Sequence, residues 1–350
     1  VILGSSNLIT VVDDDTNARI DVFVRDMTRN TTVRVSVASD GAQANGHSHE
    51  PAVSGDCRYV AFTSLASNLV ADDTNGTADV FVHDRTTHVT TRVSTMPGAT
   101  QGTRAASSPG VSGDGRLVVF DTAGNPQLGG TRVYVHDRTT GQTTEIAQPA
   151  GRSLREPAIS ADGRYVAFMS YASSGLPGDY YDDALWLHDL VGAVTQRIAV
   201  APGADDPLRG RPAIDATGST VAFTATSPVA DSPLRTWSVR LFDRASGLTQ
   251  SLAYRQLPRG GCTAVPCGAT SRPSLDGLGR QVGLSQYAND TSHIFDLVVV
   301  DRWAPIGLRL GETTDNATLL TANTRETALS GDGHLAAFAA NDTFNAGNTT

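Results

Sequence analysis

The chain of 350 residues contains no lysine, so arginine supplies all 27 of its basic side chains. Glutamate is scarce as well, and aspartate makes up most of the 36 acidic residues. Aspartate favours turns whereas glutamate favours helices, so this bias indicates turn-rich, mostly β structure. The formal net charge of −9 argues against a nucleic-acid partner, which would require a basic face.

Long hydrophobic runs are missing too. No segment approaches the roughly 18 consecutive apolar residues of a membrane helix, and we therefore expect no membrane insertion. The signatures of nucleophilic, zinc-dependent and phosphate-binding enzymes, such as Gly-x-Ser-x-Gly and His-Glu-x-x-His, do not occur. These absences favour a protein that is not an enzyme.

Cysteine is nearly absent, with three in the chain. Cys262 and Cys267 lie in the Gly/Pro-rich stretch RGGCTAVPCGA, whose spacing predicts a small disulfide-closed loop in an oxidising compartment. A zinc site is the alternative, although no second ligand pair lies nearby. Cys57 replaces a glycine in a repeated turn, and we expect it to be a free thiol.

Two sequence anchors recur six times each along the chain. One is a Ser/Asp/Gly turn before a strongly apolar strand: SGDCRYVAF, SGDGRLVVF, SADGRYVAF, DATGSTVAF, LDGLGRQVGL and SGDGHLAAF. The other is a strand that ends in Asp, usually followed by Arg: DVFVRD, DVFVHD, RVYVHD, ALWLHD, VRLFD and LVVVD. We interpret that Asp–Arg pair as a structural turn, and the preceding His83, His136 and His188 as packing residues.

Each repeat holds four short apolar runs with the alternation of β-strands, and no segment has a helical period. Four strands in a repeat of this length predict an all-β, six-bladed β-propeller with four-stranded antiparallel blades. Five blades are predicted near 49–94, 107–147, 155–199, 210–253 and 271–310. A sixth, composite blade would join 325–350 to 1–37, in a single domain over 1–350. The alternative is a fragment of a propeller with seven or eight blades.

Units such as PAVSGDCRYVAFTS…DVFVHDRTT and EPAISADGRYVAF resemble the repeats of TolB-like β-propellers, relatives of WD-type repeats. The resemblance covers nearly the whole chain. It implies a bacterial protein that is periplasmic or secreted, and a role in protein binding rather than catalysis. It also implies that the first strand of each blade is innermost, and that ligands bind at the channel mouth or on the loops of that face.

The residue just before each predicted innermost strand is polar and varies from blade to blade. These positions, with a nearby histidine, are the candidate ligand-binding residues: Glu50, Ser108, Glu156, Arg211, Arg272, Glu326 and His49. Carboxylates mixed with guanidinium groups suit a zwitterionic or polar ligand, or a charged end of a partner peptide. The structural alternative is a solvated set of ion pairs around a water-filled channel.

Two loops on the same predicted face carry oxygen ligands at alternate positions. The candidate calcium ligands are Asp73, Asn75 and Asp79 in one loop and Asp15, Asn17 and Asp21 in the other. Alternating oxygens in a tight loop are typical of Ca²⁺ sites, so calcium is the one candidate ion. The alternative is a set of Asx turns that satisfy backbone N–H groups.

The favoured function is a non-catalytic binding module or scaffold that recruits a protein or glycan through its loop face and channel mouth. We expect a monomer, with Ca²⁺ as the candidate stabilising ion. One alternative is a polysaccharide hydrolase or lyase that uses the carboxylates at the channel mouth. Another is a structural module of a larger surface protein. In each case we expect a secreted or periplasmic protein of bacterial origin.

Overall fold

A computed structural model describes residues 2–4, 12, 14–26, 29–98, 100–124, 130–147, 152–172, 184–198, 208–228, 235–252, 273–287, 295–302, 308–310, 327–329 and 336–338. Every regular element in this part of the chain is a β-strand. None of the described segments is a helix long and apolar enough to cross a membrane.

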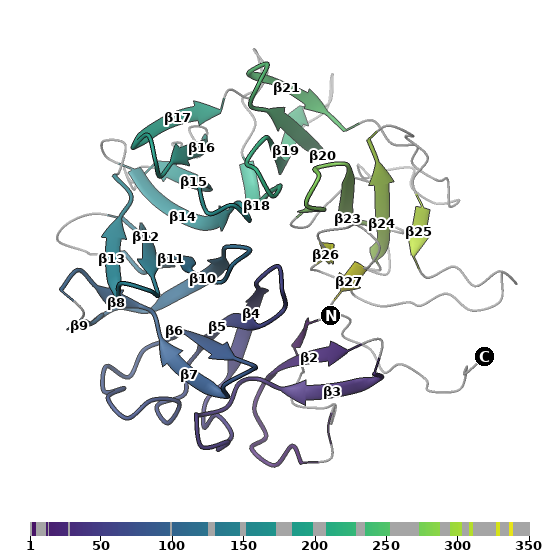
Figure 1. Cartoon of the computed structure of the whole chain (residues 1–350). Helices are drawn as coiled ribbons and strands as arrows, with labels where there is room; N and C mark the ends of the chain where they lie inside the picture. The colour runs from purple at the N-terminus through teal and green to yellow at the C-terminus, as the bar shows by residue number, and fades with distance from the viewer. Residues whose placement is uncertain are drawn as a thin grey trace, which may run out of the picture.

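Five four-stranded antiparallel sheets lie at the five positions that the repeats predict. They are arranged as blades around a ring (Figure 1). Their strands are β4 (Ser48–Val53), β5 (Tyr59–Ser64), β6 (Asp79–Asp84) and β7 (Val89–Arg92); β10 (Ala106–Val111), β11 (Leu117–Thr122), β12 (Arg132–Asp137) and β13 (Gln142–Glu145); β14 (Arg152–Ile159), β15 (Tyr165–Ala172), β16 (Ala184–Asp189) and β17 (Val194–Ile198); β18 (Leu208–Ile214), β19 (Thr220–Pro228), β20 (Arg235–Asp243) and β21 (Leu248–Ser251); and β22 (Ser274–Leu275), β23 (Gln281–Tyr287), β24 (Phe295–Asp301) and β25 (Leu308–Leu310). The chain is thus an all-β propeller, as expected.

The remaining position of the ring holds two smaller sheets. Strands β1 (Ile2–Gly4), β2 (Val22–Asp26) and β3 (Thr31–Arg34) form one of them, and β26 (Thr327–Leu329) pairs with β27 (Ala336–Phe338) in the other. Figure 1 shows β27 beside the N-terminus, where it contacts β1. In the described residues it is β1, not β27, that pairs with β2.

The segment 95–107, which connects two blades, contains a short hairpin of β8 (Thr95–Met96) and β9 (Thr100–Gln101). This hairpin brings Gln101 back towards the loop before β6. Gln101 thereby joins a polar cluster that is described below.

The core lies between neighbouring blades and is built from the middle strands. Each of the first four complete blades buries the phenylalanine of its apolar anchor: Phe62, Phe120, Phe168 and Phe223. One cluster joins Ala61 and Val80 of one blade to Val118 and Phe120 of the next. By contrast, the outermost strand β7 alternates between exposed and buried residues. This gradient explains why the middle strands are mostly apolar whereas the fourth strand is rich in threonine.

The Asp–Arg turns are structural, as predicted. Arg58 donates two hydrogen bonds to Asp84, at 2.9 and 2.7 Å, and the backbone N–H of Thr86 donates to the same carboxylate. The same arginine-to-aspartate tie recurs at Arg116–Asp137, Arg164–Asp189 and Arg280–Asp301. His83, His136 and His188 each lie 2.8–2.9 Å from a threonine hydroxyl of the adjacent strand through Nδ1, in packing positions.

Neighbouring blades also interlock through the Gly turns. The guanidinium of Arg138 lies 4.1 Å from the centre of the Tyr59 ring, and Gly115 of the same blade lies against that ring. Gly115 has a backbone φ of +72°, and a Cβ atom there would fall 2.0 Å from the tyrosine. Arg244, Tyr165 and Gly218 repeat the arrangement at a later joint. Cys57, at the equivalent turn position, is an exposed free thiol with a φ of +59°, as expected.

Candidate functional site

The innermost strands share an irregular feature at the residues that sequence reasoning singled out. Strands β4, β10, β14 and β18 each lose their register with the second strand at an X-Pro step, where a β-bulge forms. At that step Glu50, Ser108 and Glu156 have left-handed φ values of +53° to +55°. Such a conformation costs about 1–3 kcal/mol for a residue other than glycine, and its repetition in three blades marks a recurring site on the innermost strands. We refer to the bulged X-Pro steps of the four blades together as the channel mouth, after the expectation stated above.

Carboxylates of one blade accept the backbone N–H of this residue in the next. The Glu50 carboxylate accepts from the N–H of Ser108 at 2.8 Å and from the Thr63 hydroxyl at 3.2 Å. One blade further on, Asp121 accepts from the N–H of Glu156 at 2.8 Å. The hydroxyl of Ser107 donates to Asp121 as well, at 2.6 Å. The bulges are therefore held by links that cross the blade joints.

Arg211 spans the mouth towards two other blades. Its Nε donates to the carbonyl of Pro157 at 2.9 Å, and its Nη2 donates to the carbonyl of Pro109 at 2.5 Å. The latter residue lies 102 positions away in the sequence. These bonds fix the guanidinium over the bulges, so the structure brings Arg211 together with the bulge residues of two preceding blades.

Electrostatic coupling confirms that these groups share one region. Burial raises the pKa of Asp121 above its usual value, and the nearby charge of Glu50 raises it further. The hydrogen bonds from Ser107 and Glu156 and the charge of Arg211 act in the opposite direction. Asp121 is only 5% exposed. It is a buried acid at the channel mouth that was not selected from the sequence.

Of the other predicted residues, His49 lies on β4 opposite Thr63, one residue before the bulge. Arg272 and Glu326, and the Cys262–Cys267 pair, lie outside the described residues. Asp121 was missed because it stands in the second strand, where the equivalent residue of the preceding blade is Thr63. The one available signal was a charged residue at the end of an otherwise apolar strand, LVVFDT.

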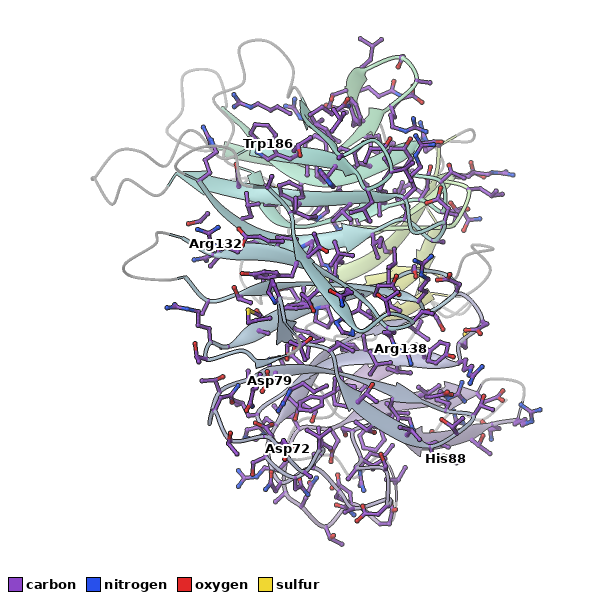
Figure 2. All side chains as sticks on the ribbon, turned by 60° about the vertical axis from the view of Figure 1, so that its left-hand side comes forward. Asp72, Asp79, His88, Arg132, Arg138 and Trp186 are labelled. Atoms are coloured by element: carbon purple, nitrogen blue, oxygen red, sulfur yellow. The ribbon has the colours of Figure 1, made fainter. Side chains whose placement is uncertain are left out.

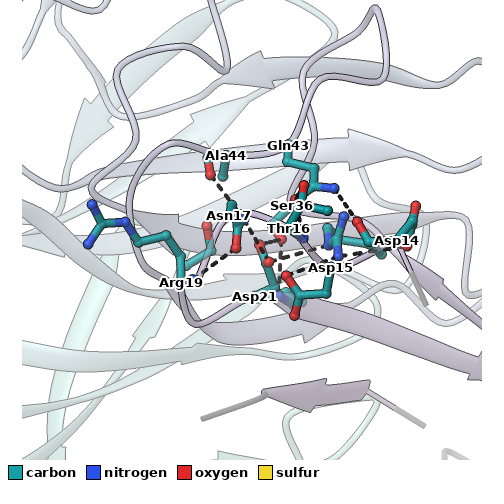
Figure 3. Close-up of polar contacts among 12 residues, drawn as sticks. Asp14, Asp15, Thr16, Asn17, Arg19, Asp21, Ser36, Gln43 and Ala44 are labelled. Atoms are coloured by element: carbon teal, nitrogen blue, oxygen red, sulfur yellow. Dashed lines mark hydrogen bonds and ion pairs between the residues drawn. The ribbon is translucent and has the colours of Figure 1, made fainter. Parts of the chain in front are cut away.

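The two candidate calcium loops form matching hydrogen-bonded clusters. In the first, Asp21 accepts from the Ser36 hydroxyl at 2.5 Å and from the Asn17 amide at 2.8 Å (Figure 3). The same Asn17 nitrogen donates to the carbonyl of Ala44, and its oxygen accepts from the N–H of Arg19. Gln43 joins the cluster by accepting from the N–H of Thr16.

The second cluster repeats this arrangement in the next blade. Asp79 accepts from the Ser94 hydroxyl at 2.5 Å and from the Asn75 amide at 2.9 Å. Asn75 also donates to the carbonyl of Gly102, and Gln101 donates to Asp73 at 2.9 Å. Burial, aided by the charge of Asp79, raises the pKa of Asp73.

The asparagines therefore present N–H groups, not oxygens, to the neighbouring carboxylates. Their orientation is fixed on both sides, because Asn75 Oδ1 accepts from the N–H of Thr77 while Nδ2 donates to a carbonyl. In the described part of the chain, no three His, Cys, Asp or Glu side chains gather closely enough to hold a metal ion. Calcium binding stays a prediction, and the observed donor set favours the Asx-turn alternative.

These clusters connect directly to the channel mouth. The carbonyl of Ile20 accepts from the N–H of Ser48 at 2.7 Å, and that of Ala78 accepts from Ala106 at 2.8 Å. Each acceptor belongs to one of the two loops just described. The donors Ser48 and Ala106 lie two positions before the bulge residues Glu50 and Ser108. His47 takes part as well, because its Nδ1 accepts from the N–H of Ile20. Figure 2 shows Asp72 and Asp79 towards one side of the ring and Arg138 and His88 towards the other.

Comparison with known proteins finds structural likeness without sequence kinship. No protein-family model matches the chain, and no curated protein matches it. Among solved structures, TolB from Acinetobacter baumannii superposes with a TM-score of 0.52 at 16% identity, over 83% of this chain and 59% of that one. The chain thus spans less than two thirds of that TolB.

Two further structures extend over more of both chains. A putative TolB from Agrobacterium tumefaciens has a TM-score of 0.53 at 13% identity, covering 92% of this chain and 98% of that chain. An oligogalacturonate lyase in complex with manganese has a TM-score of 0.59 at 14% identity, covering 91% and 77%. At these identities the likeness concerns the fold alone, and it establishes that the chain is similar in fold to the TolB-like β-propellers.

Proposed function

We propose that this propeller is a binding module that recruits a protein or a glycan at the mouth of its channel. The observation that carries the proposal is the set of bulged X-Pro steps, which place Glu50, Ser108, Glu156 and Arg211 at equivalent positions of four blades. Left-handed backbone at residues other than glycine clusters at functional sites, and three of these four steps have it. Rigid scaffolds with varied polar residues at one end are typical of recognition.

The test starts from two probe sets, an array of acidic and neutral oligosaccharides and a library of short peptides, each screened against the whole chain. Any probe bound by the wild type is then measured with Glu50→Gln and Arg211→Met. We expect each variant to weaken binding at least about tenfold, roughly 1.4 kcal/mol, because charged hydrogen bonds to a ligand are lost.

Arg116→Ala is the matched control for these variants. Arg116 pairs with Asp137 at the opposite end of the strands and is 54% exposed. Its loss should leave the affinity unchanged. Equal binding by the wild type and both mouth variants would place the binding surface elsewhere and contradict the proposal.

A second candidate function is cleavage of an acidic polysaccharide. It is favoured by one observation, the buried carboxyl of Asp121 close enough to Glu50 for the two charges to interact across a blade joint. A carboxyl with a raised pKa beside an ionised one can serve as a general acid and base pair. An oligogalacturonate lyase shares this fold. Incubation with oligogalacturonate and detection of unsaturated products tests it, and no product at high protein concentration would exclude this substrate.

We further propose that the ring closes as a six-bladed propeller in which the C-terminal strands complete the blade of the N-terminal ones. The contact between β27 and β1 supports this closure. The sequence patterns also support a secreted or periplasmic location, where a small disulfide loop at Cys262 and Cys267 would be stable.

A further inference from the structure

Each loop cluster beside the channel mouth contains a guanidinium group. The Arg34 side chain is 4% exposed, and its nitrogens lie 3.3 Å from carboxylate oxygens of both Asp15 and Asp21. In the second cluster the Arg92 side chain is 11% exposed and lies 3.9 Å from Asp73. Arg92 also donates to the backbone carbonyl of Asp72 at 3.1 Å. The arginines occupy equivalent positions, because Arg34 is the last residue of β3 and Arg92 is the last residue of β7, each the outermost strand of its sheet.

The carboxylates around these arginines require a positive charge. Asp21 and Asp79 are fully buried, and burial of an ionised carboxyl is costly unless a counter-charge and hydrogen bonds compensate. Serine and asparagine supply the hydrogen bonds but carry no charge. The guanidinium groups supply the charge.

The contacts of Arg34 are those of a counter-ion. Its Nε and Nη2 are buried and close to carboxylates, yet neither has the alignment of a hydrogen bond. Arg92 Nε is likewise buried without a hydrogen-bond partner, and the Nη1 atom of Arg92 lies 3.9 Å from the Asp73 carboxylate. These arginines therefore act through charge, as a bound cation would. The asparagines turn N–H groups towards the carboxylates, which a cation would repel.

We propose that Arg34 and Arg92 take the place of a structural cation, so that the loop clusters are stable without divalent metal. The native chain is then insensitive to calcium and to chelators. Removal of the Arg92 guanidinium leaves the carboxylate of Asp73 and the carbonyl of Asp72 facing a vacated position, and both are oxygen donors of the kind that a hard divalent cation such as Ca²⁺ binds. This inference does not depend on what the channel mouth binds.

The test is thermal unfolding of the wild type and of Arg92→Ala, each in excess EDTA and in millimolar calcium. The wild type should have the same midpoint in both. Arg92→Ala should unfold at least about 5 °C lower in EDTA, because a buried pair is broken. Calcium should restore at least half of that loss, because an ion that binds only the folded state raises its stability.

Arg58→Ala is the matched control, since Arg58 pairs with Asp84 at an exposed turn and its side chain is 39% exposed. Its unfolding midpoint should not respond to calcium. A wild-type midpoint that falls in EDTA would overturn the proposal, and so would Arg92→Ala with equal midpoints in EDTA and calcium.

Arg92→Gln provides a second route if the alanine variant does not fold, because glutamine keeps most of the side-chain volume. Calorimetric titration with calcium chloride should then detect binding to Arg92→Gln and none to the wild type. Binding to the wild type, or its absence in folded Arg92→Gln, would contradict the proposal.

Discussion

At the residue scale, left-handed backbone serves two different purposes in this ring. At Glu50 and Glu156 it forms the bulge that carries a charged residue at the channel mouth. The cost of this conformation is offset by hydrogen bonds between blades. At Gly115 it permits a turn to lie directly on the Tyr59 ring of the neighbouring blade. The second use is a matter of packing alone, and it can be isolated by substitution.

We predict that Gly115→Ala lowers the free energy of unfolding by about 1–3 kcal/mol more than Gly141→Ala does. Both glycines have φ values near +70°, so both variants carry the same backbone strain. An added Cβ at Gly115 meets the tyrosine ring at 2.0 Å, whereas nothing lies within 4 Å of Gly141. Urea unfolding of the two variants measures the difference. Equal losses would show that the joint adapts without cost.

The residues of the mouth could be predicted only in part. Glu50, Glu156 and Arg211 were selected from the sequence as residues just before predicted innermost strands, and the structure places them inside β4, β14 and β18, at the bulge. Asp121 was not, since its importance depends on the N–H of Glu156, 35 positions away and in another blade. Arg34 and Arg92 were overlooked because a threonine-rich outer strand gives no sign that one of its ends is buried.

At the scale of single elements, the third strand ends in an aspartate that an arginine from the previous turn holds in four of the five complete blades. The double hydrogen bond from Arg58 keeps the pKa of Asp84 well below its usual range. Because the folded pKa is lower than that of the unfolded chain, the ionised carboxylate stabilises the fold above about pH 4. The stabilisation is lost as the pH falls below that value.

Asp84→Asn should therefore lower the unfolding midpoint at pH 7, by an amount worth about 1 kcal/mol given the partly exposed arginine. The difference from the wild type should shrink as the pH falls below about 4, where the wild-type aspartate becomes protonated. Midpoints measured between pH 2 and pH 8, about the range that brackets these values, check the prediction. A difference that stays constant with pH would mean that the charge of Asp84 is irrelevant.

The elements themselves were well predicted from sequence. The apolar parts of the anchors SGDCRYVAF and DVFVHD correspond to β5 and β6, because buried middle strands have a nearly unbroken hydrophobic pattern. The hairpin of β8 and β9 was not foreseen, since its strands have two residues each and leave no alternation to detect. Short polar elements of this kind depend on their neighbours, here on Gln101 bonding to Asp73.

At the scale of the whole molecule, five four-stranded blades and their order were predictable because the anchors repeat. The join between the two ends of the chain was not settled in the same way. The sequence suggested one composite blade, and the structure places β1 next to β2 while β26 pairs with β27 beside them. The repeats predict the four strands within one blade, but they do not predict which terminal strands pair with each other where the two ends of the chain meet.

If the proposed closure holds, a chain ending at residue 325 should unfold at least about 5 °C below the wild type, because the contacts of β27 with β1 and of β26 with β23 are lost. A chain ending at residue 338 keeps β26 and β27 and serves as the control, with an unchanged midpoint. Thermal unfolding followed by circular dichroism compares the three. Equal midpoints would show that the C-terminal strands do not close the ring.

The bulge at the X-Pro step of the innermost strands has a backbone conformation that recurs between blades and a residue that varies between them. The same backbone step accepts Glu50, Ser108 and Glu156, so its conformation does not require one residue type. Its N–H is held by a carboxylate of the preceding blade, from Glu50 at Ser108 and from Asp121 at Glu156. A substitution at Ser108 therefore changes the chemistry of the mouth and keeps this link, whereas a substitution at Glu50 also removes a link to the next blade. Descendants of such a chain would acquire new specificities most readily at the blades whose bulge residue is not itself such a link, with each change tested by selection while the other blades preserve the fold.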